Sequence, residues 1–142
     1  MHKKKLALAA VAAILAGCAT APPPVPALLS PTLDDYKRDV AKRIAAANAA
    51  SYSAPSPEVM KSIVVLEITV DDLGAPLTVS VLRTNGYGEL AQRALQSVAK
   101  AAPFAAPGPA LLQGASSMSF LETFLFRDDD SFQLRSLVAT PD

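Results

Sequence analysis

The sequence predicts an α+β domain: an N-terminal helix and an antiparallel sheet of three or four strands, in the order β-β-α-β-β, packed against helices. Three observations lead to this prediction. Apolar residues follow helical spacing after residue 32, two alternating stretches flank a glycine-containing turn, and a Phe-rich alternating stretch lies near the C-terminus. The chain has 142 residues, which is enough for one hydrophobic core. Helices and strands without regular βαβ repeats are typical of the α+β class.

The first predicted helix spans residues 33–49. Thr32 can cap its N-terminus, and Asp34 and Asp35 in the first turn complement the helix dipole. The apolar positions with helical spacing are Leu33, Tyr36, Val40 and Ile44. The basic residues Lys37, Arg38, Lys42 and Arg43 then fall on the wetter side. We expect them to form a solvated face rather than a binding patch.

A β-hairpin is predicted in the stretch of residues 62–86. Its first strand alternates through Val64, Leu66, Ile68 and Val70, and its second through Leu77, Val79 and Val81. The turn contains Gly74. Glu67 and Thr69 should therefore lie on the wetter face of the first strand.

A second helix and two further strands are predicted after the hairpin. The helix covers residues 89–102 and ends before Pro103. A Phe-rich strand follows, with Met118, Phe120, Phe124 and Phe126 on one face. After a turn at Asp128 to Asp130, a short last strand is expected over residues 131–137.

The first 18 residues, MHKKKLALAAVAAILAGC, have the pattern of a bacterial secretory signal. Three lysines precede an uncharged apolar stretch, and small residues precede Cys18. The apolar stretch is about a dozen residues long, short of the ~20 that a membrane-spanning helix requires. We expect residues 1–17 to be a cleaved signal peptide.

Leu15 to Cys18 resembles the lipobox of bacterial lipoproteins, in which the cysteine is acylated and becomes the new N-terminus. Cys18 is the chain's single cysteine, which excludes an internal disulfide. Several acyl chains together hold a protein firmly on a membrane. Ala19 occupies the place of the aspartate that retains such proteins at the inner membrane, so the resemblance implies the periplasmic face of the outer membrane. The alternative is an ordinary signal peptide with an incidental cysteine.

Residues 18–31 are rich in proline and read as an extended tether between the lipid and the domain. A ligand for a proline-binding domain is the alternative. The formally neutral chain carries no basic stripe, which argues against nucleic-acid binding. Cleavage of the leader would remove the only histidine, His2, and with it any histidine-based catalytic or metal site. No cofactor is expected.

The run from Val64 to Phe104 resembles the C-terminal domain of the TonB and TolA envelope proteins. The shared features are a strand, a Gly-containing turn, a second strand, a polar step before Gly86, a helix, and Ala-x-Pro-Phe. The predicted domain covers residues 32–137, with a tail at 138–142. The resemblance implies that a sheet edge accepts a strand from a partner protein. The Tyr-Pro step usual in TonB proteins is absent, and the short tether argues against energy transduction.

The last predicted strand supplies the candidate partner-binding residues, Phe132, Gln133, Leu134 and Arg135. A calcium site at Asp128 to Asp130 is less favoured than a solvated turn. Glu67 and Glu122 lack a nucleophile beside them, so no enzyme is expected. We expect a lipid-anchored periplasmic protein-binding module. The alternatives are a structural lipoprotein or small-ligand carrier with a Phe-lined groove, and an accessory part of a TonB-type transport system.

Overall fold

The computed structural model describes residues 32–55 and 60–138. The predicted signal peptide, Cys18 and the tether at residues 18–31 lie outside the described residues, as does the tail from residue 139. The described chain is an α+β domain with a four-stranded antiparallel sheet, so the predicted fold class is confirmed at this level.

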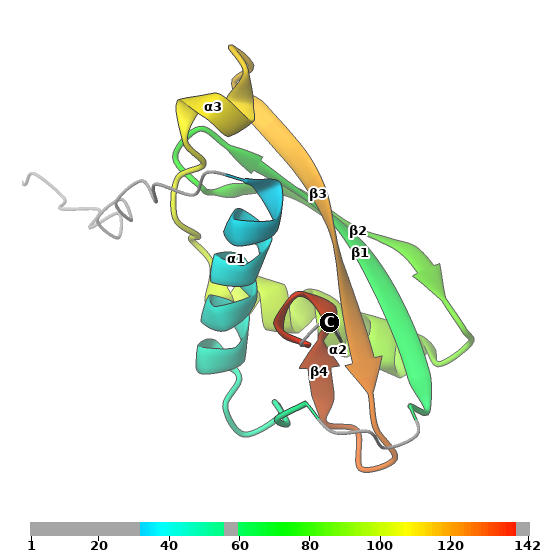
Figure 1. The fold of residues 1–142 in the computed structure, drawn as a ribbon. Coiled ribbons are helices and arrows are strands. Elements are labelled where there is room, and N and C mark those ends of the chain that lie inside the picture. Colours follow the sequence, from blue (N-terminus) through cyan, green and yellow to red (C-terminus); the bar gives the residue numbers. More distant parts are fainter. Residues whose placement is uncertain (1–31, 56–59, 139–142) are drawn as a thin grey trace, which may run out of the picture.

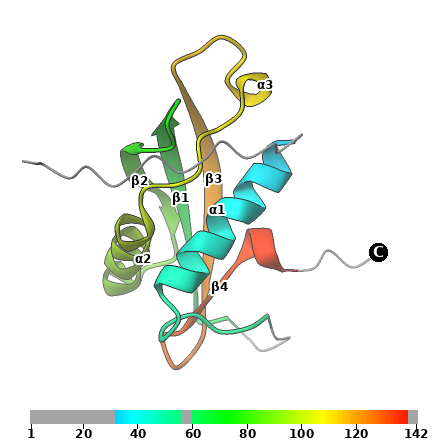
Figure 2. The ribbon, with the colours of Figure 1, turned by 90° about the vertical axis from the view of Figure 1, so that its left-hand side faces the viewer.

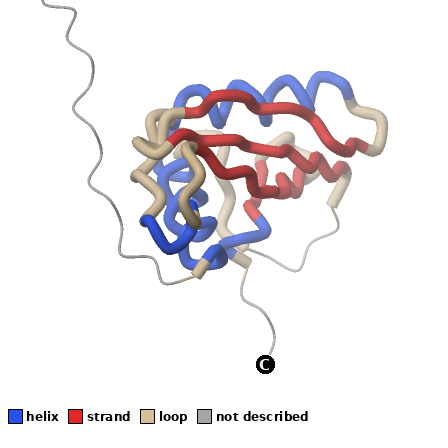
Figure 3. Tube along the Cα trace, turned by 90° about the horizontal axis from the view of Figure 1, so that it is seen from above, coloured by secondary structure: helices blue, strands red, loops and turns tan. Residues whose placement is uncertain are grey.

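Pairs of strands and helices follow α1 along the chain (Figure 1). They are α1 (Leu33–Ala47), β1 (Ser62–Asp71), β2 (Pro76–Thr84), α2 (Gly88–Ala101), α3 (Pro109–Leu112), β3 (Ser117–Phe126), β4 (Phe132–Leu134) and the 3-10 helix η1 (Arg135–Leu137). The strand order across the sheet is β2-β1-β3-β4, and every neighbouring pair is antiparallel. The view from above shows the strands side by side in a twisted sheet (Figure 3). The long strands β1 and β3 therefore form its centre.

Side-chain hydrogen bonds fix both ends of α1. The Thr32 hydroxyl accepts from the Asp35 N–H at 3.1 Å, which satisfies one of the free N–H groups of the first turn. At the other end, the Asn48 amide donates to the carbonyl oxygens of Ile44 at 2.8 Å and Ser97 at 2.9 Å. Asn48 thus ends α1 and attaches it to α2.

Both long helices lie on the same face of the sheet. α1 crosses β3 obliquely, and α2 lies beside α1 (Figure 2). The side chains that point toward the helices alternate along the strands, as the period of two requires. They form one core with both helices, including Tyr36, Val40, Ile44, Val64, Leu66, Ile68, Val70, Leu90, Val98, Phe104, Phe120, Phe124, Phe126, Phe132 and Leu134.

The opposite side of the sheet, which we call the open face, is not covered by either long helix. Toward α3 it is polar, and Thr69 and Ser119 share a 2.7 Å hydrogen bond there. Toward the other end it is aliphatic, with Ile63 opposite Leu125 and Val65 opposite Thr123. One end of the open face therefore exposes apolar side chains.

The last strand differs from the prediction. It has three residues instead of seven, because the chain turns into η1 at Arg135. The Ser136 N–H donates to the Glu122 carboxylate at 3.3 Å, and this contact lies where the chain leaves the ladder with β3. The short helix α3, which begins at Pro109, was not predicted either.

Candidate interaction surfaces of the sheet

The β2 edge of the sheet has no further strand beside it in the described chain. In an antiparallel sheet, the N–H and C=O of one residue both point to the strand on one side. Those of the next residue point to the other side. The Ile63 N–H donates to the Asn85 side chain at 3.1 Å, and the Asp71 N–H donates to the Ala75 carbonyl at 2.9 Å. The backbone N–H and C=O groups of the odd-numbered residues of β1 therefore point to β2.

This alternation determines which backbone groups of β2 are free. Thr78 and Ser80 lie opposite Thr69 and Glu67, two odd-numbered residues of β1. Their backbone groups are thus turned inward, to β1. Val79, which lies between them, directs its N–H and C=O to solvent. The β2 edge is an open template for another strand.

The side chains of β2 are largely exposed and apolar. Leu77, Val81 and Leu82 are exposed, and Arg83 is the only charged residue of the strand. Two register shifts interrupt its pairing with β1, next to Val65 and next to Thr69. Such bulges twist an edge and limit unspecific pairing, whereas a strand with a single charged residue leaves pairing possible.

The other edge, at β4, is already occupied at Phe132. The Phe132 N–H donates to the Ser51 carbonyl and the Ser53 N–H donates to the Phe132 carbonyl, both at 2.9 Å. Phe132, Gln133 and Leu134 are buried, and Arg135 is exposed. Of the four predicted partner-binding residues, only Arg135 is therefore accessible on the surface.

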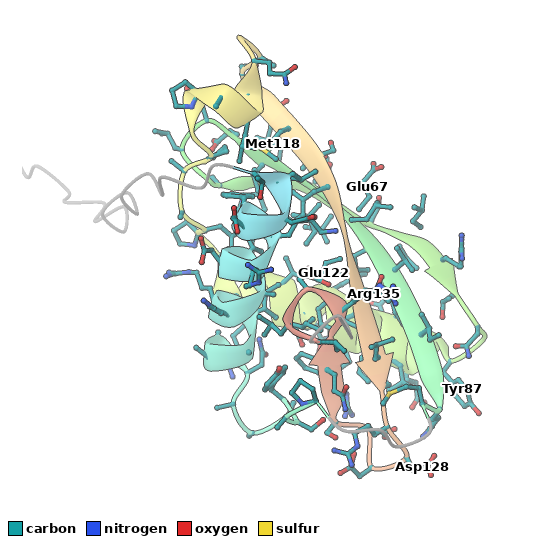
Figure 4. All side chains as sticks on the ribbon, viewed as in Figure 1. Glu67, Tyr87, Met118, Glu122, Asp128 and Arg135 are labelled. Carbon is teal, nitrogen blue, oxygen red and sulfur yellow. The ribbon has the colours of Figure 1, made fainter. Side chains whose placement is uncertain are left out.

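A groove of about 630 Å³ runs from the aliphatic end of the open face around the edge of β3 to α1. Figure 4 shows that Glu122 of β3 and Arg135 of η1 lie close to each other. The lining combines aliphatic and charged side chains: Asp34, Lys37, Arg38, Val65, Leu82, Arg83, Leu121, Glu122, Thr123, Leu125, Arg135, Ser136 and Val138. Four of the six charged residues are basic.

Glu122 lies at the inner end of this groove and is only 1% exposed. Its Oε1 accepts from the N–H of Thr123 at 2.9 Å and from the N–H of Ser136 at 3.3 Å. Its Oε2 is buried and has no hydrogen-bond partner within the described chain. Burial raises the pKa of the Glu122 carboxyl, and the hydrogen bonds from Ser136 and Thr123 and the charge of Lys37 oppose this rise.

The two glutamates considered as a pair lie on opposite faces of the sheet. Glu67 is exposed on the open face, where Leu121 is its neighbour on β3, and Glu122 points to the helices. The structure therefore does not bring the two carboxylates together.

Two of the three aspartates in the β3–β4 turn form side-chain contacts, Asp129 within the turn and Asp130 with Lys61, the residue before β1. Asp129 accepts from the Ser131 N–H at 3.0 Å and from its hydroxyl at 2.6 Å, and these bonds lower the pKa of Asp129. Asp130 pairs with Lys61 at 2.8 Å. In residues 32–55 and 60–138, no group of three or more His, Cys, Asp or Glu side chains could hold a metal ion.

Sequence reasoning missed the groove because its residues come from five separate elements. One signal was present, since Val81 and Leu82 are adjacent apolar residues in a strand that otherwise alternates. The pairing with β1 skips Leu82, and this bulge places Leu82 at the groove.

No family model, curated protein or solved structure matches the chain. The resemblance to the TonB and TolA domains stays a prediction. Among the described residues, no helix is long and apolar enough to cross a membrane.

Proposed function

We propose that this chain is a lipid-anchored, periplasmic protein-binding module of the bacterial cell envelope, and that it binds an extended segment of a partner protein along the β2 edge. The observation that carries this proposal is the free backbone of β2 together with its exposed apolar side chains. Main-chain hydrogen bonds supply affinity in strand addition, and alternate side chains supply specificity.

This proposal moves the binding site for the partner from the last strand, where it was predicted, to β2. Strand addition was expected at residues 132–135, but the backbone of Phe132 bonds to Ser51 and Ser53. β2 offers nine residues and no competing bond on its outer side in the described chain. The TonB- and TolA-like arrangement of two strands, helix and two strands after an N-terminal helix belongs to this proposal, and the element order supports it.

The carrier alternative has less support. Phe120, Phe124, Phe126 and Phe132 are buried in the core, where Phe124 and Phe132 lie 4.9 Å apart between ring centroids. These rings fill space between the sheet and the helices, which is their ordinary structural role.

The test uses a photo-crosslinking amino acid at Val81 of the full-length protein in its own envelope. We expect an adduct with a partner from Val81 and none from Gln92, an exposed residue on α2. Val79→Pro removes the N–H that faces solvent, and Val79→Ala removes a similar part of the side chain but keeps this N–H. The adduct should be lost in the proline variant and retained in the alanine variant. Equal adducts in both variants, or no adduct from Val81, would contradict strand addition at β2.

A further inference from the structure

The aliphatic end of the open face is an exposed apolar patch. Leu82 is 57% exposed, and Ile63 and Leu121 are each 41% exposed. Val138, which follows η1, is exposed beside them at the groove. Contiguous apolar surface of this kind marks a contact with a protein or a membrane.

Basic side chains from three different elements border this patch. They are Lys37 and Arg38 of α1, Arg83 of β2 and Arg135 of η1. Arg38 pairs with Asp35 at 3.3 Å in an exposed contact. Arg83 and Arg135 form no ion pair with the described residues. Two guanidinium groups next to exposed aliphatic side chains are therefore available to anions.

The start of α1 lies at the same groove. Asp34, Lys37 and Arg38 belong to its first two turns and line the groove. The described domain thus begins, at Thr32, next to the patch. Fourteen extended residues reach at most about 50 Å, so an anchor at Cys18 would keep this end of the domain near the lipid.

We propose that the domain rests on an anionic phospholipid surface through this face, with Leu82 and Leu121 in the headgroup region and Arg83 and Arg135 on lipid phosphates. The proposal rests on the proposed function for the membrane that the domain meets, but not on strand addition. Basic side chains around an inserted apolar surface are the combination that binds proteins to such membranes. Two acidic groups lie close to this face: Glu67 is opposite Leu121 on the sheet, and Asp34 lines the groove. The four basic side chains outnumber them there, and acidic residues farther away weigh little, because the Debye length is about 8 Å at physiological ionic strength.

The chain contains no tryptophan, so one introduced tryptophan reports on a single position. The protein used is the mature chain from residue 18 to 142 with Cys18→Ser, which lacks the acyl chains. Leu82→Trp places the probe in the patch. Leu73→Trp places it in the β1–β2 turn, where the leucine is 60% exposed and outside the groove. Vesicles contain either phosphatidylcholine alone or phosphatidylcholine mixed with phosphatidylglycerol.

We expect a blue shift of the Leu82→Trp emission and quenching by brominated lipid with the mixed vesicles, and neither with phosphatidylcholine alone. Leu73→Trp should respond to neither. Arg83→Ser in the Leu82→Trp background should lower the partition coefficient about fivefold. Lys100→Ser removes the same charge from the exposed end of α2 and should leave it unchanged.

The proposal would be overturned by the absence of a shift with mixed vesicles, by an equal response of the Leu73→Trp protein, or by equal effects of Arg83→Ser and Lys100→Ser. A blue shift that depends on protein concentration without lipid would assign the patch to a second copy of the chain and also overturn it. Strand addition is tested separately, by the crosslinked adduct at Val81. The two proposals can therefore fail independently.

Discussion

The phenol of Tyr36 on α1 donates a 2.8 Å hydrogen bond to the backbone carbonyl of Ala105, 69 residues later in the chain. Both residues are buried, and the Tyr36 ring also meets Phe120 edge-on at 5.6 Å between centroids. Burial raises the pKa of the Tyr36 hydroxyl well above its usual range, so the group stays a donor at all ordinary pH values. This contact joins α1, the segment after α2, and β3.

Tyr36→Phe should lower the free energy of unfolding by about 1–2 kcal/mol. The variant keeps the ring but leaves a buried carbonyl without its donor, and such an unsatisfied group costs about this much. Urea denaturation followed by circular dichroism measures the change. Tyr87→Phe is the control, because Tyr87 is exposed and should change stability by less than about 0.5 kcal/mol. Equal stability of the Tyr36→Phe variant and wild type would show that water replaces the phenol at Ala105.

Gly74→Ala should be among the most destabilising single substitutions in the hairpin. Gly74 has a φ of +85°, and an added Cβ would collide with the backbone carbonyl oxygens of Phe104 and Ala105. Gly114 has a nearly equal φ of +82° with open space around it. We expect Gly114→Ala to cost about 1 kcal/mol for the backbone conformation, and Gly74→Ala at least about 2 kcal/mol more for the collision. Thermal denaturation of the two variants gives this difference, and similar melting temperatures would contradict it.

Glu122→Gln should change how stability depends on pH. Because the pKa of Glu122 is raised in the folded state above its usual 4.5, the folded state holds its proton more tightly than the unfolded state. Its contribution to stability is fully present below pH 4.5 and is lost as the pH rises through the raised value. The glutamine variant should therefore gain stability relative to wild type between pH 4 and pH 8. Glu67→Gln, on the exposed face of β1, should follow the wild-type curve, and parallel curves for all three proteins would rule out this role of Glu122.

Cys18→Ser should abolish labelling by a fatty-acid analogue and release the protein from the outer-membrane fraction. A serine hydroxyl is a far weaker nucleophile than a thiolate at neutral pH. The melting temperature of the domain should not change, because the described fold begins at Thr32. A wild-type protein that carries no label but stays in the membrane fraction would show that Leu15 to Cys18 match the lipobox by chance.

Periodicity was a good guide where the chain alternates regularly. Tyr36, Val40 and Ile44 recur at helical spacing, and all three are buried in α1. Val64, Leu66, Ile68 and Val70 alternate, and all four lie in the core. These residues were predictable because each buries its side chain through the geometry of its own element.

The interaction surfaces were less predictable because they depend on distant segments. Phe132 to Leu134 have the sequence of an exposed last strand, yet Ser51 and Ser53 bond to Phe132 from 79 residues or more upstream. Lys37 and Arg38 read as part of a solvated helix face, and only the fold brings them to the same groove as Arg83 and Arg135. No local pattern records such neighbours.

The bonds of Ser51 and Ser53 to Phe132 also affect how the protein is made. α1 is synthesised first, but its partners are Ser97, Ala105 and, through the segment after it, Phe132. Contacts this far apart in sequence form late, since loop closure must precede them. A chain emerging from the ribosome would therefore keep α1 and the segment after it without these contacts until Ser97, Ala105 and Phe132 have been synthesised. Under the proposed function, in which the chain is exported, this late packing of α1 would favour translocation before the domain has folded.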